Sequence, residues 1–326
     1  MKLFLFLASV LSIQYEYCQA KYLYDKFLEN VNLVKVIAVV RHGDRAPVKF
    51  LPEYNFPVKC VHPIRNKSGS DVTVTNLRIQ DCEEGDLTEK GVVQLFRLGE
   101  YLKSRYRFSN AKYYSSNLSR TIASMHSLIM GLEGKSHVIH VSKSFSRALT
   151  SNFHDCPRMA RMGKRQKHFT NSKSKISAKL VDNYQCFKCH DLTDLQSRFS
   201  DKAIKQAHQK RAKEDSYSAF HEEMQSLQTG RVLDRFLQIL AGDDTFSIVA
   251  AHDDIISSLI TLFHPQKLIW PPYASLFVME IFESADQKYY RIVFNSNVLA
   301  MGPFSELVDI LGRYSITKSE YLDKCK

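Results

Sequence analysis

The sequence predicts an α/β fold in which a mostly parallel sheet carries helices on both faces. Short apolar runs typical of buried strands alternate along the chain with longer stretches of helical periodicity. Two of these apolar runs end directly before arginines and histidines, and in open α/β sheets such residues gather beyond the carboxyl ends of the strands. The 326 residues are enough for one large core or two modest ones.

The expected elements follow one another in a regular order. Strands are predicted at 33–40, 111–115 and 245–251, helices at 88–106, 119–130 and 254–262, and a late hairpin at 275–283 and 289–296. The region between residues 150 and 240 has no clear strand pattern and holds helical stretches at 203–213 and 217–241. It therefore interrupts the alternation of strands and helices.

The first predicted strand runs into the most informative segment of the chain, Arg41-His42-Gly43-Asp44-Arg45-Ala46-Pro47. Two guanidiniums can hold phosphate oxygens through paired hydrogen bonds, and a neutral imidazole between them can attack phosphorus. A second pair of chemically active residues, His252-Asp253, follows the strand predicted at 245–251. We therefore expect phosphoryl chemistry at the ends of these two strands.

Both segments resemble the histidine acid phosphatases, a branch of the histidine phosphatase superfamily with the signature Arg-His-Gly-x-Arg-x-Pro. The resemblance implies that His42 is the nucleophile and that Asp253 is the general acid. It implies that the substrate phosphate is bound by Arg41, Arg45, Arg120 and His252. It implies no cofactor and no metal site.

Two positions depart from the family pattern. Ser119 precedes Arg120 where relatives commonly carry Asp, so the assignment of Arg120 depends on the Arg-Thr pair and on the strand before it. Asp254 follows Asp253 where many relatives carry a small neutral residue. We expect Asp254 to cap the following helix, since Asp is favoured at helix N-termini.

The resemblance also implies a phosphoglycerate mutase-like core with an inserted cap over the phosphate site. We assign the core to 21–149 and 241–326, and the mainly helical cap to 150–240. Eight Lys or Arg residues and no acidic residue lie between Arg158 and Lys179, which concentrates the net charge of +11 in the cap. This run is either a solvated face or a binding surface for a polyanion such as a sulfated glycan. Nucleic acid is disfavoured, because stacking aromatics are almost absent from it.

Further segments are similar to the 2-phosphoxylose phosphatases, which act on the glycosaminoglycan linkage region. They are the segment at 82–94, Cys186-Phe187-Lys188-Cys189-His190 and the terminal Tyr321-Leu322-Asp323-Lys324-Cys325. The implied substrate is a phosphorylated glycan. The alternatives are a general secreted or lysosomal acid phosphatase, an inositol-phosphate phosphatase, and an inactive relative that binds polyanions.

The N-terminus predicts export. A charged start, an apolar run at 3–13 and Ala20 fit a secretory signal peptide formed by residues 1–20, with an uncleaved signal anchor as the alternative. We therefore expect a secreted or luminal protein of the Golgi or lysosome. The polar segment around Asn66-Lys67-Ser68 is a candidate glycosylation site in that environment.

Removal of residues 1–20 would leave an even number of cysteines. These candidates for disulfide bonds are Cys60, Cys82, Cys156, Cys186, Cys189 and Cys325. Their connectivity cannot be deduced from spacing. The Cys-x-x-Cys-His pattern at 186–190 also permits covalent haem attachment or half of a zinc site, but its polar and basic neighbours favour disulfide pairing.

Overall fold

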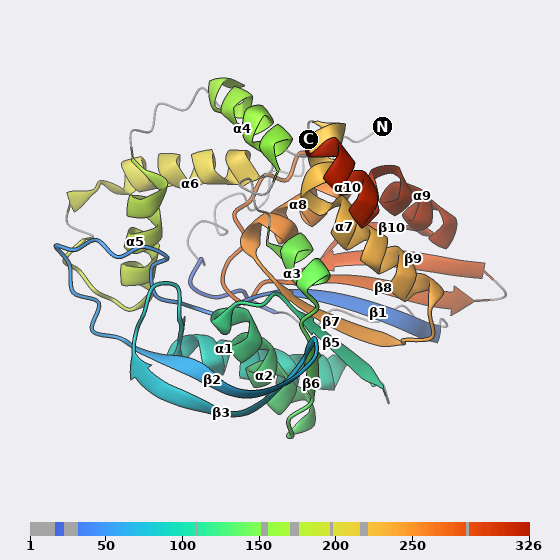
Figure 1. Ribbon diagram of the computed structural model, residues 1–326, viewed down its shortest axis with the longest axis horizontal. Helices are drawn as coiled ribbons and strands as arrows, with labels where there is room; N and C mark the ends of the chain where they lie inside the picture. The colour runs from blue at the N-terminus through green and yellow to red at the C-terminus, as the bar shows by residue number, and fades with distance from the viewer. Residues whose placement is uncertain are drawn as a thin grey trace, which may run out of the picture.

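A single ten-stranded sheet forms the centre of the molecule (Figure 1). The computed structural model describes residues 17–22, 32–107, 110–150, 156–169, 176–195, 198–215, 221–284 and 287–326. The strands are β1 (Asn32–Arg41), β2 (Lys59–Ser68), β3 (Asp71–Asp81), β4 (Leu87–Thr88), β5 (Ala111–Ser115), β6 (Val138–His140), β7 (Phe246–Ala251), β8 (Leu276–Ser284), β9 (Gln287–Phe294) and β10 (Asn297–Pro303). Their order in the sheet is β10-β9-β8-β1-β7-β5-β6-β3-β2-β4.

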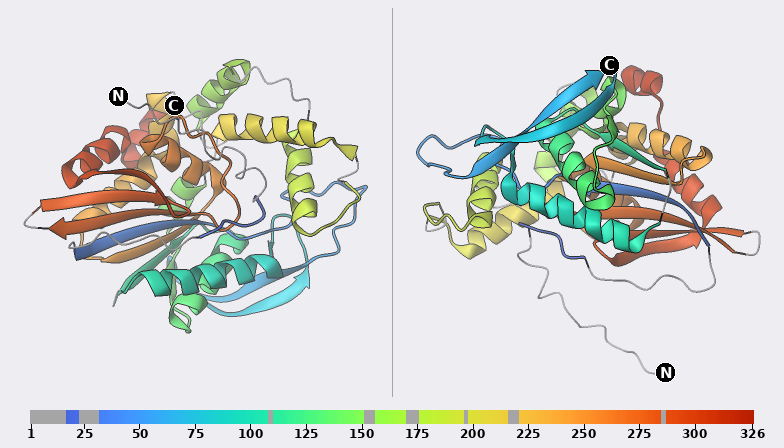
Figure 2. Two further views of the ribbon diagram at one scale, coloured as in Figure 1. Left: turned by 180° about the vertical axis from the view of Figure 1, so that it is seen from behind. Right: turned by 90° about the horizontal axis from the view of Figure 1, so that it is seen from below.

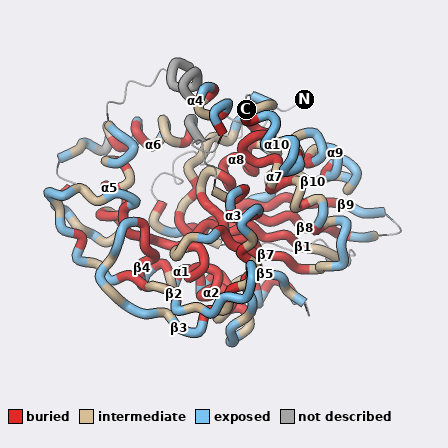
Figure 3. The backbone as a smooth tube through the Cα atoms, in the orientation of Figure 1, coloured by how far each residue is buried: buried red, intermediate tan, exposed pale blue. Residues whose placement is uncertain are grey.

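The four strands β1, β7, β5 and β6 pair in parallel at the centre of the sheet. Antiparallel strands flank this centre on both sides. The predicted α/β class and the predicted late hairpin are confirmed, the hairpin as β8 and β9. Every residue of β7 is buried, as expected for a strand covered on both faces (Figure 3).

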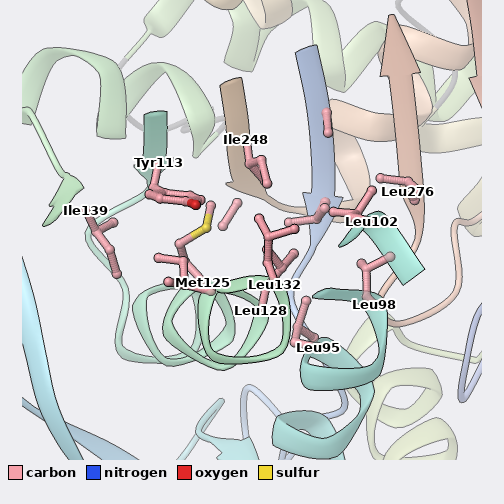
Figure 4. Packing of buried hydrophobic residues seen from close by; sticks show 14 of the residues in the cluster. Leu95, Leu98, Leu102, Tyr113, Met125, Leu128, Leu132, Ile139, Ile248 and Leu276 are labelled. Carbon is pink, nitrogen blue, oxygen red and sulfur yellow. The ribbon is translucent and has the colours of Figure 1, made fainter. Parts of the chain in front are cut away.

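Helices cover both faces of the sheet. They are α1 (Glu89–Arg105), α2 (Ser119–Glu133), α3 (Lys143–Leu149), α4 (Pro157–Phe169), α5 (Ala178–Cys189), α6 (Asp201–Asp215), α7 (Glu222–Ala241), α8 (Asp253–Phe263), α9 (Phe304–Tyr314) and α10 (Lys318–Lys324). Alternate residues of β1 point to opposite faces. Ala38 belongs to the cluster with the leucines of α1 and α2, whereas Val39 packs with α7 and α8. Figure 4 shows these leucines under the sheet.

Helices α5 and α6 lie beside the sheet rather than over it, as two opposite views show (Figures 1 and 2). Tyr184 and Phe187 of α5 pack with Ala46 of the arginine-histidine segment. Helix α7 differs from the sequence prediction, because Leu233 and Phe236 pack in the core under the sheet. The first turns of α7 pack differently, because Met224 and Leu227 lie against Met159 of α4. The division of the chain at residues 150 and 240 therefore stays a prediction, and α7 contacts elements on both sides of it.

Three disulfides join Cys18 to Cys189, Cys60 to Cys82, and Cys156 to Cys325. Disulfides of this number are typical of secreted or luminal proteins.

The prediction that Cys186 pairs is wrong, since this thiol is free and buried. The even number of cysteines was misleading, because the count excluded Cys18 as part of the predicted signal peptide. Helix α5 places Cys189 against Cys18, while Cys186 faces Arg45 and Tyr273.

Asn66 is exposed on β2, near the turn of the β2–β3 hairpin, so the expected loop is a strand. Its glycosylation stays a prediction. In the part of the chain that the structure describes, we find no helix with the length and hydrophobicity needed to cross a membrane.

Candidate active site

Three parallel strands end together at one edge of the sheet. Arg41 at the end of β1 pairs with Ala251 at the end of β7, and Ala250 pairs with Ser115 at the end of β5. The residues that follow these ends therefore meet, as the strand pattern predicted. The rings of His42 and His252 lie 5.5 Å apart between centroids.

Helices α2 and α8 begin at the same edge. Arg120 lies in the first turn of α2 and Asp253 in the first turn of α8. Helix N-termini carry partial positive charge, so both helices favour a bound anion here. Helix α1 approaches the site closely as well, because a Cβ on Gly43 would lie only 2.5 Å from the carbonyl oxygen of Gly91. Glycine at position 43 is therefore a packing requirement.

His42 is arranged as a neutral nucleophile. Its Nδ1 lies 2.9 Å from the carbonyl oxygen of Gly43. A carbonyl oxygen only accepts hydrogen bonds, so Nδ1 carries the proton and Nε2 carries the free lone pair. Burial, together with the positive charges of Arg120 and Arg41, holds the pKa of His42 well below its ordinary value. The ring therefore stays unprotonated at mildly acidic pH.

Three arginines surround this imidazole and share one feature. The Nε atoms of Arg41, Arg45 and Arg120 are buried and have no hydrogen-bond partner among the described residues. Buried donors without partners are costly, and they mark places where a ligand completes the hydrogen bonding. The three orphan donors indicate an anion site next to His42.

The other ends of two of these guanidiniums are held by protein groups. Arg41 donates from Nη1 to the carbonyl oxygen of Pro271 at 2.5 Å and from Nη2 to Asp253 at 3.1 Å. Arg45 makes a two-pronged ion pair with Asp182 of α5, at 2.8 and 3.3 Å. Helix α5 thus fixes the position of one phosphate-binding candidate.

Arg120 has no ion pair among the residues that the structure describes. Burial and the neighbouring charge of Arg45 lower its pKa to about 10, which still leaves it protonated at neutral pH. The hydroxyl of the preceding Ser119 contacts Nδ1 of His62 at 3.4 Å. Arg120 therefore contributes positive charge that no described carboxylate neutralises directly.

His252 forms a hydrogen bond between its Nε2 and the hydroxyl of Ser116 at 2.9 Å. Burial and Arg120 hold its pKa well below the ordinary value, although Asp253 acts in the opposite direction. The second histidine is thus also neutral. It lies within reach of the anion site as a neutral hydrogen-bonding group.

Asp253 is ionised in this state. Burial alone would raise its pKa, but Arg41, Arg211 and the indole N–H of Trp270, which donates to it at 2.6 Å, together hold the pKa well below the ordinary value. The role of Asp253 as the general acid stays a prediction. The carboxyl has to acquire its proton when substrate binds.

Asp254 lies in the first turn of α8 and is not its N-cap, because the N-cap residue is His252. Its carboxylate accepts the backbone N–H of Ile255 at 2.9 Å. This contact satisfies one of the free donors in the first helical turn.

Sequence reasoning missed four residues that shape the site: Tyr17, Asp182, Trp270 and Tyr273. Tyr17 was assigned to the signal peptide, and Asp182 and Tyr273 lie in no motif. Trp270 had one signal, since it is the only tryptophan in the sequence. The ring of Tyr273 lies under the guanidinium of Arg41, 4.5 Å from its centroid.

The Cys-x-x-Cys-His segment serves a structural purpose. Cys189 is bonded to Cys18, and His190 Nε2 lies 2.5 Å from the carboxylate of Asp44. Asp44 also accepts from the hydroxyl of Thr88 at 2.6 Å. Because Cys189 and His190 are committed to these partners, the haem and zinc alternatives do not fit this segment.

Three curated relatives cover most of the chain. The chain is 26% identical over 345 residues to 2-phosphoxylose phosphatase 1 of Xenopus tropicalis, covering 82% of this chain and 68% of the relative. It is 24% identical to lysophosphatidic acid phosphatase type 6 of Mus musculus, covering 92% and 89%. It is 25% identical to prostatic acid phosphatase of Mus musculus, covering 78% and 77%.

Solved structures share the fold. The phytase of D. castellii superposes with a TM-score of 0.62 at 14% identity, covering 96% of this chain and 87% of that one. The phytase of Citrobacter braakii superposes with a TM-score of 0.61 at 13% identity, covering 87% and 98%. The family model of the histidine phosphatase superfamily (branch 2) matches residues 32–231. The chain therefore belongs to branch 2 of the histidine phosphatase superfamily and is a phosphomonoester hydrolase.

Proposed function

We propose that this enzyme hydrolyses phosphomonoesters in two steps through a phosphohistidine formed on His42. The observation that carries the proposal is the set of three buried Nε–H donors, from Arg41, Arg45 and Arg120, around a neutral imidazole. A phosphoryl group supplies the missing acceptors and the missing negative charge.

In the first step, the phosphate is bound by the three arginines and by His252. Nε2 of His42 attacks phosphorus in line with the departing oxygen, and Nδ1–H remains donated to Gly43. The P–O bond to the alcohol breaks as the P–N bond forms. In the second step, water attacks the phosphohistidine, and inorganic phosphate leaves with His42 restored.

Asp253 handles the proton in both steps. The substrate phosphate competes for Arg41 and adds negative charge beside the carboxylate, and both effects raise the pKa of Asp253 from its low value. The carboxyl can then take up a proton and donate it to the leaving alcohol oxygen. As a carboxylate, it later accepts a proton from the attacking water.

For the substrate class, we propose a phosphorylated glycan such as the 2-phosphoxylose of the glycosaminoglycan linkage region. The relative named 2-phosphoxylose phosphatase 1 supports this choice, while relatives named for lysophosphatidic acid and structures of phytases support the rival choices.

A groove of about 530 Å³ also supports an anionic substrate chain. Four basic residues line it together with Tyr114 and two acidic residues: Lys112, Lys318, Arg231, Arg235, Asp234 and Asp244. Tyr114 lies two residues before Ser116, the partner of His252. The side chains of the basic run at 164–175 lie outside the described residues.

The reaction is tested by the turnover of an aryl phosphomonoester by the secreted full-length protein, with and without a chelator. Three guanidiniums provide the positive charge, so we expect turnover to be unchanged by the chelator. His42→Ala should reduce the rate by about 10⁴-fold or more, because it removes the atom that carries the phosphoryl group. Wild-type protein with no turnover that still binds heparin would support an inactive, polyanion-binding relative instead.

The glycan is tested by steady-state kinetics with a phosphorylated linkage-region oligosaccharide and with a small aryl phosphate. Lys112→Gln with Lys318→Gln should raise KM for the oligosaccharide only, because long-range attraction acts on the polyanion. The matched control is Lys103→Gln with Lys324→Gln, two exposed lysines outside the groove.

A parallel triple variant at Lys164, Arg165 and Lys167 compares the basic run with the groove. If every variant, including the control, raised KM for the oligosaccharide equally, the change in net charge alone would explain the result. The glycan assignment would then be dropped in favour of a general acid phosphatase.

A further inference from the structure

We infer that residues 17–20 form a strap that belongs to the active site, in which Tyr17 positions Arg41 for the substrate phosphate and the Cys18–Cys189 disulfide holds the strap in place. The inference rests on the proposed role of Arg41 in phosphate binding. It assigns a function to a segment that the sequence alone placed in a removable signal peptide.

Tyr17 contacts Arg41 in two ways. Its hydroxyl accepts a hydrogen bond from Nη2 of Arg41 at 2.7 Å, and its ring centroid lies 4.8 Å from the guanidinium carbon. The ring also packs at 4.4 Å from Trp270 and at 4.8 Å from Tyr273, measured between centroids. Tyr17 is almost fully buried by these contacts, with 7% of its surface exposed.

Hydrogen bonds and a disulfide hold the strap against three other segments of the chain. Its backbone pairs with Tyr273, since Tyr273 N–H donates to the Tyr17 carbonyl at 2.8 Å and Ala20 N–H donates to the Tyr273 carbonyl at 3.0 Å. The carbonyl of Cys18 accepts from the amide of Gln94 at 2.6 Å. The disulfide to Cys189 then ties the strap to the cap helix α5.

The position of Arg41 depends on this strap because its Nη2 is shared. The same nitrogen donates to Tyr17 at 2.7 Å and to Asp253 at 3.1 Å. Without the tyrosine hydroxyl, the guanidinium retains the carboxylate as its stronger partner and moves toward Asp253. Its free Nε–H then points less well at the phosphate, and the carboxylate becomes harder to protonate.

The hydroxyl of Tyr17 suits this role because it remains neutral. Burial raises its pKa to about 12, although the neighbouring Arg41 opposes the shift. A neutral hydroxyl holds the guanidinium without neutralising its charge. A carboxylate at this position would instead compete with the phosphate.

The test compares two identical substitutions, Tyr17→Phe and Tyr22→Phe. Both keep an aromatic ring, but the hydroxyl of Tyr22 is buried without a partner in the described structure, and its ring stacks on Tyr101 at 5.1 Å. We expect Tyr17→Phe to weaken sulfate binding, measured by calorimetry, by about 10-fold, as for one hydrogen bond to a charged group. Aryl phosphate kcat/KM should fall by at least the same factor, and Tyr22→Phe should match wild type in both.

The calorimetric measurement needs no turnover, so it separates this inference from the proposed function. Sulfate binding that is unchanged by Tyr17→Phe overturns the positioning role, whether or not the wild type is active. Weakened sulfate binding in an enzyme that forms no phosphohistidine keeps the strap and overturns the mechanism.

The disulfide is tested with Cys18→Ser alone and combined with Tyr17→Phe. If the disulfide acts by holding Tyr17, the double variant should lose no more sulfate affinity than Tyr17→Phe alone, because both changes remove one interaction. Additive losses would overturn that role. Intact mass analysis of secreted wild-type protein should show that Tyr17 is retained, and a fully active chain that starts at Lys21 would contradict the strap directly.

Discussion

Arginines are buried at two places along strand β1, but their electrostatic surroundings are opposite. Beside the middle of β1, Val36 pairs with Glu280, whose carboxylate accepts from Tyr106 at 2.6 Å, from Arg291 at 2.5 Å and from Arg105 at 3.2 Å. At the carboxyl end of β1, Arg41, Arg45 and Arg120 surround the neutral His42, and each has a buried Nε–H without a partner among the described residues.

The difference separates charge that holds the fold from charge that binds a ligand. A buried carboxylate surrounded by donors is satisfied within the chain, and removing it leaves buried cations unpaired. A buried cluster of guanidiniums with too few acceptors is a cost that the fold bears until an anion arrives. Substitutions in the paired cluster should therefore change stability, and substitutions in the anion site should change activity.

The largest expected effect on the anion site comes from Arg120→Ala. Loss of a guanidinium aimed at the transferred phosphoryl group should lower kcat/KM by about 10²- to 10³-fold. The melting temperature should stay the same or rise, because Arg120 has no ion pair among the described residues. Arg97→Ala, an exposed arginine on α1, serves as the control. A lower melting temperature with little loss of activity would show that Arg120 stabilises the fold and does not bind the phosphate.

Asp253→Asn should separate substrates by their leaving groups. An aryl phosphate with a very acidic leaving group departs without a proton and should lose little activity in the first step, whereas an alkyl phosphate should slow by about 10²-fold or more. Transient kinetics of alcohol release measures this step. Asp254→Asn is the matched neighbour and should be mild on both substrates, because its carboxylate accepts the backbone N–H of Ile255 in the first turn of α8. Equal losses on both substrates would exclude Asp253 as the acid.

Glu280→Gln should give the opposite outcome to Arg120→Ala. Loss of the carboxylate leaves Arg105 and Arg291 without their shared partner and should lower the free energy of unfolding by about 3 kcal/mol or more. The kcat of the molecules that remain folded should be unchanged. Glu283→Gln, an exposed residue of the same strand, is the control in a denaturant titration. A large fall in kcat would show that the Glu280 cluster and the anion site are coupled.

The smallest effect concerns pH. Because the pKa values of His42 and His252 are lowered in the folded state, the unfolded chain binds more protons below their ordinary value of 6.5. The free energy of unfolding should therefore fall by about 1 kcal/mol for each ring as the pH falls from 6.5 to 5.5. A bound anion raises both pKa values, so stabilisation by sulfate should grow over the same interval. Stabilisation that is independent of pH would mean that sulfate binds away from the histidines.

The catalytic strands and most of the proposed site could be predicted because their signals are local. His42, Arg45 and Asp253 each lie within a few residues of an apolar run, and parallel strands bring such ends together. The β2–β3 hairpin was missed because its outer residues are largely polar and exposed, so its alternation resembles a loop. Short stretches of sequence do not reveal which face such a strand will bury.

The residues that the sequence did not reveal are held by contacts between distant segments. Tyr17 reaches Arg41 across 24 positions, and Asp182 reaches Arg45 across 137. No local pattern encodes such pairs, since either residue alone is ordinary. Cys186 was assigned to a disulfide by counting, and the count changed once Cys18 was found to pair with Cys189.

The central claim, that the anion site serves a nucleophilic His42, is tested most directly by trapping the intermediate. Wild-type protein mixed with a ³²P-labelled phosphomonoester and quenched in alkali should carry acid-labile, base-stable label on the peptide that contains His42. His42→Ala should carry none, while it still binds sulfate. Label on a serine or on another histidine, or rapid turnover with no labelled protein at any quench time, would contradict the account.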